Sequence, residues 1–110
     1  MSDKEEARFA ELEELALTYA RAQSTVDHLS EFRKSKKALL MRHAEASGHR
    51  TAAMQEREAY ADPGYLELLD GLKAATETAL AAKWKLEIAR MRFEWARTTA
   101  ANRRAEMNLR

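Results

Sequence analysis

Residues 80–96 read LAAKWKLEIARMRFEWA, and this stretch decides the fold. Apolar residues recur in it at steps of three or four, the spacing of side chains on one face of an α-helix. One set, the tryptophan stripe, is Leu80, Trp84, Ile88, Met91 and Trp95. A second set, the alanine stripe, is Ala79, Ala82, Leu86, Ala89, Phe93, Ala96 and Ala100. At about 100° per residue the two stripes are centred roughly 180° apart. A helix with two apolar faces is expected to be covered on both sides, once by this chain and once by a second copy or another molecule.

The composition favours long helices over strands. The chain has 110 residues, of which 34% are charged and 45% hydrophobic, and it contains 3 Gly and 1 Pro. This mixture is typical of helices that lie largely in water, and β-branched residues are scarce. Cysteine is absent, the N-terminus does not have the pattern of a signal peptide, and no apolar run approaches the roughly 20 residues of a membrane span. We therefore expect a cytoplasmic protein that does not cross a membrane.

Capping signals divide the chain into helices. Ser2-Asp3-Lys4-Glu5 is a capping box, and Gly48 is a typical residue just beyond a helix end. Thr51 and Asp62-Pro63 are further start signals. The expected elements are a helix over about 3–47, a short helix over about 52–60 and a helix over about 63–108, in a single domain of residues 1–110. Lower helix propensity at 24–30 leaves open whether the first helix is continuous there.

The fold class that follows is all-α: a long antiparallel helical hairpin with a short capping helix. Each long helix would measure roughly 65–70 Å at about 1.5 Å per residue. Such a hairpin has a thin core, and a chain of this size buries little surface to offset its conformational entropy. We therefore expect a homo-oligomer, with the tryptophan stripe as its interface.

Charge falls in blocks along the chain. The net charge is −5 over residues 1–31, +5 over 32–50, −4 over 51–82 and +5 over 83–110. In an antiparallel hairpin the first block lies beside the fourth and the second beside the third. Opposite charges are therefore expected to face each other along the two long helices.

The two basic blocks are candidate phosphate-binding regions, because clustered Lys and Arg release counterions when they meet a nucleic-acid backbone. Our first-choice residues are Arg33, Lys34, Lys37 and Arg42, with Arg103 and Arg104 as second choice. The alternative is a solvated helix face, since the charges of the first cluster wrap around the helix. Trp84 and Trp95 stand among cations and could stack on bases. Their spacing with Ile88 and Met91 favours an interface instead.

Catalytic and metal-binding patterns are missing from the sequence. It contains no Gly-rich phosphate loop, no HExxH and no nucleophile elbow. The acidic residues near the N-terminus match the dipole of a helix start, and no histidine stands near them. We expect a protein that is not an enzyme and has no catalytic residue, metal site or cofactor.

Several stretches together resemble a known group of proteins. They are Glu56–Ala61, Tyr65-Leu66, Leu69–Leu72, Lys83–Trp95 and Arg103–Met107. These stretches resemble small helical proteins that phages and prophages encode among early genes for DNA replication and recombination, and Met-Arg-Phe-Glu-Trp at 91–95 is the most specific part. The expected architecture is also similar to UvsY-type recombination mediators, which are all-helical, form rings, bind single-stranded DNA and help to load a RecA-like recombinase.

The resemblance implies a non-enzymatic accessory of DNA recombination or replication in the host cytoplasm. Such a protein would bind single-stranded DNA as a homo-oligomer, with a RecA-like recombinase or a single-strand-binding protein as partner. The resemblance assigns no role to any individual residue. The alternative function is a helical protein-interaction module, an adaptor or inhibitor of a host or phage protein, without direct nucleic-acid binding.

Overall fold

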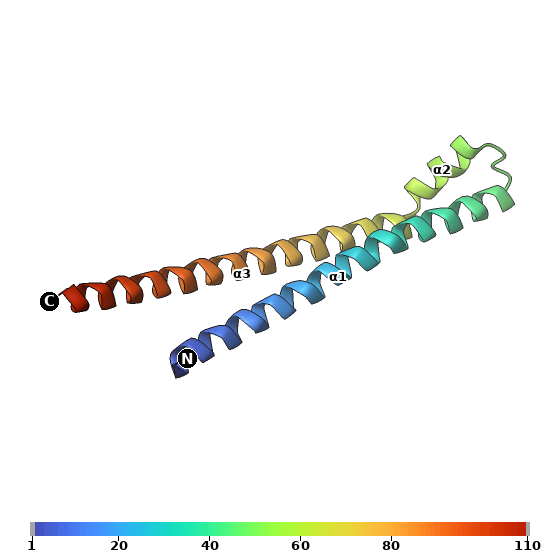
Figure 1. Cartoon of the computed structure of the whole chain (residues 1–110). Coiled ribbons are helices and arrows are strands. Elements are labelled where there is room, and N and C mark those ends of the chain that lie inside the picture. The colour runs from blue at the N-terminus through green and yellow to red at the C-terminus, as the bar shows by residue number, and fades with distance from the viewer. Residues whose placement is uncertain (1, 110) are drawn as a thin grey trace. The chain divides into compact units, whose positions relative to one another are not determined.

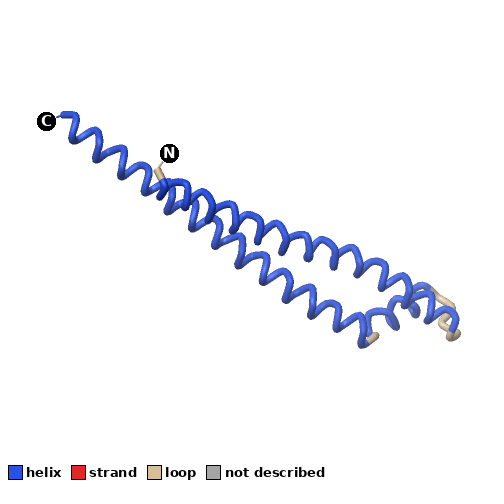
Figure 2. The backbone as a smooth tube through the Cα atoms, turned by 90° about the horizontal axis from the view of Figure 1, so that it is seen from below, coloured by secondary structure: helices blue, strands red, loops and turns tan. Residues whose placement is uncertain are grey.

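The computed structural model describes residues 2–109, which are helical apart from Ser2 and the connections at 47–51 and 62 (Figure 2). The helices are α1 (Asp3–Ala46), α2 (Ala52–Ala61) and α3 (Pro63–Leu109) (Figure 1). The prediction of an all-α fold is confirmed. Helix α1 continues without a break through residues 24–30. No helix in the described range has an apolar segment long enough to cross a membrane.

Local hydrogen bonds fix the helix ends. The Ser2 and Thr51 hydroxyls accept from the backbone N–H groups of Glu5 and Met54, each at 3.2 Å. Asp62 Oδ1 accepts from the Gly64 N–H at 2.8 Å at the start of α3. These contacts satisfy N–H groups that have no partner within the helix, which is why the capping residues could be recognised in the sequence.

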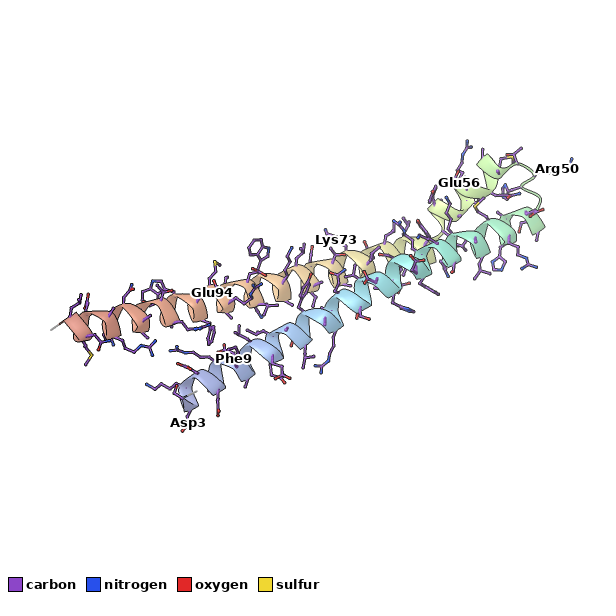
Figure 3. All side chains as sticks on the ribbon, viewed as in Figure 1. Asp3, Phe9, Arg50, Glu56, Lys73 and Glu94 are labelled. Carbon is purple, nitrogen blue, oxygen red and sulfur yellow. The ribbon has the colours of Figure 1, made fainter. Side chains whose placement is uncertain are left out.

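The chain divides into two compact units. Unit 1 joins the start of α1, up to Ala20, to α3 from Leu80 onward, and unit 2 is Arg21–Ala79. In unit 1 the two helical segments run antiparallel, and Phe9 of α1 points toward α3 (Figure 3). Its ring centroid lies 4.7 Å from that of Phe93. Phe93 of the alanine stripe thus packs against α1 in unit 1, where Ala82 and Phe93 are buried.

Unit 2 holds the end of α1, all of α2 and the start of α3. Its buried residues are Ala44, Ala59, Tyr65 and Ala79. The Tyr65 ring packs edge-on against the exposed Tyr60 ring, with 5.6 Å between centroids. Because Tyr60 belongs to α2 and Tyr65 to α3, this pair fixes the short helix against the start of the long one.

The buried side of α3 follows a seven-residue period. The buried and half-buried residues on this side follow one another at alternating steps of three and four. They are Tyr65, Leu68, Leu72, Ala75, Ala79, Ala82, Leu86, Ala89, Phe93 and Ala96. This is the a and d spacing of a helix that packs lengthwise against another helix. Ala100, which the sequence pattern assigned to the same stripe, is exposed.

Candidate functional site on helix α3

The tryptophan stripe is the largest exposed apolar feature of α3, and it lies in unit 1. Its residues are 49% (Leu80), 58% (Trp84), 43% (Ile88), 57% (Met91) and 71% (Trp95) exposed. By helical geometry the stripe is centred roughly 180° from the buried side of α3. Neither indole therefore belongs to the core of the chain, and packing within the chain does not explain the spacing of the stripe.

A row of cations runs along another side of α3 in unit 1. Lys83, Arg90, Arg97 and Arg104 follow one another at intervals of seven residues, and all are exposed. Seven residues advance a helix by about 10.5 Å and return nearly to the same face. We call these four residues the basic row. Our reading of the sequence missed the row because it grouped cations by position in the chain, whereas the informative signal is the constant interval.

Little of the basic row is neutralised by ion pairs. Arg90 is the one member of the row that forms an ion pair within residues 2–109. Its Nη1 lies 3.3 Å from Glu87 Oε1. The Arg97 guanidinium lies 5.8 Å from the centre of the Phe93 ring, a favourable contact between a cation and an aromatic face. Arg97 and Arg104 also line a groove that includes Glu5 and Glu94. Three of the four row members thus form no ion pair within residues 2–109, although Glu5 and Glu94 lie at the same groove as Arg97 and Arg104.

A second groove in unit 1 lies between α1 and α3. Leu15, Ala89 and Phe93 supply its apolar lining, and Ile88 of the tryptophan stripe lines it as well. Its charged lining residues are Arg8, Glu11, Lys85 and Arg92. Three cations against one carboxylate make this groove electropositive, on the side of the stripe opposite the basic row.

The first-choice nucleic-acid residues lie in unit 2, and the structure does not bring them together on one surface. Lys37 Nζ lies 2.6 Å from Glu56 Oε1 and so joins α1 to α2. Lys34 pairs with Glu31 within α1. Arg33 and Arg42 are exposed. At about 100° per residue, Arg42 lies on the opposite side of α1 from Arg33, so these residues do not form one phosphate-binding face.

Lys37 and Glu56 shift each other's protonation. The hydrogen bond to Glu56, and after it the contact with Tyr60, raises the pKa of Lys37 well above its usual value. The same hydrogen bond, and a second one donated by the Tyr60 hydroxyl, lowers the pKa of Glu56. The Lys37 ammonium also lies 4.6 Å from the centre of the Tyr60 ring. Both members of the pair are therefore charged at neutral pH, and the ion pair that they form connects α1 to α2.

The charge blocks do not meet as ion pairs between the long helices. In the described part of the chain, the ion pair that joins two different helices is Lys37–Glu56, between α1 and α2. Helices α1 and α3 share no ion pair in that part of the chain, but in unit 1 Glu5 of the acidic first block lines one groove with Arg97 and Arg104 of the basic fourth block. Arg103 and Arg104, the second-choice residues, are exposed.

The tryptophan stripe and the basic row are surfaces that suit an apolar and an anionic ligand, respectively. No group of three or more His, Asp or Glu side chains gathers into a possible metal site among residues 2–109. No family model, curated protein or solved structure matches this chain. The exposed side of α3, with its stripe of large apolar residues and its row of cations, is thus the feature from which function can be argued.

Proposed function

We propose that this protein is a non-enzymatic accessory of DNA recombination or replication that binds single-stranded DNA as a homo-oligomer. The observation that carries the proposal is the basic row of α3, in which four exposed cations recur at seven-residue intervals. The row includes Arg104, one of the second-choice residues, and Arg103 stands beside it in the sequence. The resemblance of residues 35–108 to phage early-region proteins supports the same function.

Phosphate is the ligand that suits the row. Arg binds phosphate oxygens through two parallel hydrogen bonds, and three of the four row members are Arg. The net charge of the chain is only +1, so attraction to DNA must come from a local concentration of positive charge. An oligomer would present several rows to one strand and would gain affinity by avidity.

A single strand is proposed rather than a duplex because the UvsY-type mediators that the expected architecture resembles bind single-stranded DNA. The aromatic rings nearby do not provide a stacking surface: Phe93, beside Arg97, is buried against Phe9, and the two indoles lie roughly 130° around α3 from the basic row. A RecA-like recombinase or a single-strand-binding protein, in the cytoplasm of a host cell, would be the partner of such an accessory.

Salt dependence of binding tests this function. A labelled single-stranded oligonucleotide is titrated with the protein, and fluorescence anisotropy is recorded at several salt concentrations. Each phosphate contact lowers the logarithm of the binding constant with a slope of about −0.7 against the logarithm of salt concentration. Four contacts per chain predict a slope near −3, which is roughly a 50-fold loss of affinity between about 50 and 200 mM salt.

Paired variants locate the binding site. Arg97→Glu with Arg104→Glu should reduce the slope by about half and weaken binding tenfold or more at low salt. Arg33→Glu with Arg42→Glu makes the same charge change on exposed positions of α1 and should leave the slope unchanged. Loss of binding in the α1 variant alone would move the site to the first-choice cluster. Binding that ignores salt in the unmodified protein would remove the proposal.

The exposed tryptophan stripe favours a second candidate function, a helical protein-interaction module without direct nucleic-acid binding. A row of five large apolar residues is the type of surface that docks another helix. This candidate predicts that the protein leaves the oligonucleotide unbound at every salt concentration. It also predicts that the tryptophan stripe is covered by a different protein and that the chain alone stays monomeric.

A further inference from the structure

We propose that the tryptophan stripe of α3 binds the same stripe of a second copy, with the two α3 helices parallel and in register. This inference deepens the oligomeric part of the proposed function and rests on it. It adds the orientation of the two copies and the charged residues that select that orientation. The occupant is argued from the pattern of the stripe and from the charges on its two flanks.

The stripe has the spacing of a two-stranded helical interface. Within the tryptophan stripe, Trp84, Ile88, Met91 and Trp95 follow one another at steps of four, three and four, and Leu80 precedes them at a flanking position. Two positions of each heptad, a and d, thus point toward a partner helix: Ile88 and Trp95 at a, and Trp84 and Met91 at d. In a parallel pair in register, each of these residues packs against its own counterpart. Every layer then joins two large apolar side chains.

The two indoles offer a large exposed apolar surface to such an interface. A Trp side chain contributes up to about 250 Å² when buried. With Trp84 at 58% and Trp95 at 71% exposure, most of that area remains available on each indole. The stripe lies on the side of α3 away from the α1 contact, so a second copy can approach it without displacing α1. The same patch serves both copies, as a twofold interface requires.

The two flanks of the stripe carry opposite charges. Glu87 and Glu94 follow one edge, and Lys85 and Arg92 follow the other. In heptad terms the carboxylates hold the g positions and the cations hold the e positions. Lys85, Arg92 and Glu94 are exposed, while Glu87 is half-buried and pairs with Arg90 of its own helix at 3.3 Å, so a contact with a second copy would have to exchange or share that partner. Side chains at e and g lie beside the interface, where their charges decide how two helices are oriented.

This charge pattern selects the parallel orientation. In a parallel pair a g residue meets the e residue five positions later in the partner, so Glu87 faces Arg92 of the second copy, and by symmetry the contact occurs twice. In an antiparallel pair e faces e and g faces g. Lys85 would then face Arg92, and Glu87 would face Glu94, so every flanking contact would join like charges. The parallel pair has the attractive contacts and avoids the repulsive ones.

Charge exchange at the flanks tests both the partner and its orientation. Sedimentation equilibrium without DNA measures the dimer dissociation constant of the unmodified chain, of Arg92→Glu, of Glu87→Arg and of the double variant. In the parallel pair each single variant places like charges together and should raise the dissociation constant roughly tenfold. The double variant restores opposite charges and should return it close to the starting value. Circular dichroism confirms that these surface variants stay helical.

The opposite pattern would overturn the inference. If each single variant tightened the dimer, the helices would be antiparallel, because Lys85 would then face a carboxylate. A chain that remains monomeric at high concentration, or a dimer insensitive to Trp84→Glu, would show that a second copy does not occupy the stripe. The assay contains no nucleic acid, so these failures are separate from loss of salt-dependent DNA binding. DNA binding by a strictly monomeric chain would remove this inference alone.

Cysteine cross-linking gives an independent measure of register. The chain contains no cysteine, so a single introduced thiol can react only with its counterpart in a second copy. Thr98→Cys places the thiol in the d layer beyond Trp95, where a parallel pair in register brings the two thiols together and should form a disulfide under mild oxidation. In the antiparallel pair described above, residue 98 would face residue 81, so the two thiols would be about 25 Å apart. Ala74→Cys lies on an exposed part of α3 outside the stripe and serves as the control. Equal cross-linking of both variants would contradict the proposed register.

Discussion

At the scale of single residues, Gly48 shows how one position ends a long helix. Its φ of 103° lies in the left-handed region that side chains disfavour. In this conformation the Gly48 N–H donates to the Glu45 carbonyl at 3.1 Å, and the His49 N–H donates to the Ala44 carbonyl at 3.0 Å. These are the two hydrogen bonds of a Schellman motif. The backbone thus leaves α1 because residue 48 has no Cβ.

Replacing Gly48 with Ala should destabilise the protein by about 1 kcal/mol, because Ala pays the cost of a positive φ. Space is not the cause, since a Cβ at this position would meet no atom within 4 Å. Gly71→Ala is the matched control. It lies inside α3 with the same open surroundings, and there Ala should stabilise the helix by up to about 1 kcal/mol. Urea unfolding of both variants measures the difference, and shifts of the same sign would contradict this account.

Residues that act locally could be recognised in the sequence, whereas residues that act between helices could not. Ser2, Thr51 and Asp62 cap helices through backbone groups two or three positions away, so the local pattern was sufficient. The contact of Lys37 with Glu56 crosses 19 positions and depends on how α2 folds back. For this reason the sequence groups Lys37 only with the neighbouring cations of α1, whereas the structure shows that it also pairs with Glu56 of α2.

At the scale of the helix, the buried side of α3 is made mostly of small residues. Ala79 and Ala82 are 3% and 7% exposed, respectively. The sequence predicted the alanine stripe correctly up to Ala96, because a seven-residue apolar period is a property of one helix alone. The seven-residue interval of the basic row is likewise present in the sequence. That the row remains exposed is not, because exposure depends on which face of α3 is covered by α1.

Enlarging a side chain on the buried side of α3 should destabilise the protein. Ala79→Leu adds three carbon atoms at a buried position of unit 2 and is expected to destabilise the protein by about 1–3 kcal/mol, since the neighbouring side chains must move. Ala74→Leu makes the same change on an exposed part of α3 in the same unit and should be nearly neutral. The midpoint of urea unfolding separates the two variants. Equal effects would mean that the side of α3 at residue 79 is not tightly packed.

At the scale of the whole molecule, the chain has very little core for its length. Six hydrophobic residues are buried in the described part: Ala44, Ala59, Tyr65, Ala79, Ala82 and Phe93. Four of the six are Ala, and no large side chain is fully buried in that range. The sequence indicated this shortage, because long polar helices leave few residues for an interior. It did not show what compensates for the shortage.

Self-association predicts that thermal stability rises with protein concentration. A dimer is favoured over unfolded monomers by mass action, so the melting temperature should increase by a few degrees for each tenfold rise in concentration. Removing both indoles with Trp84→Ala and Trp95→Ala should abolish this dependence and cost the monomer little, since both side chains are exposed. Calorimetry over a range of concentrations provides the measurement. A melting temperature independent of concentration in the unmodified protein would argue against a stable dimer.

Both tryptophans of the chain lie on the exposed stripe, and this gives the protein an intrinsic optical probe. Indole emission shifts to shorter wavelength when water is removed from around the ring. Folding of the isolated chain leaves both rings largely hydrated, so its emission maximum should remain close to that of the unfolded chain. A shift of the emission maximum to shorter wavelength would therefore report that another molecule covers the tryptophan stripe. Fluorescence spectra recorded over a range of protein concentrations would detect this without a label.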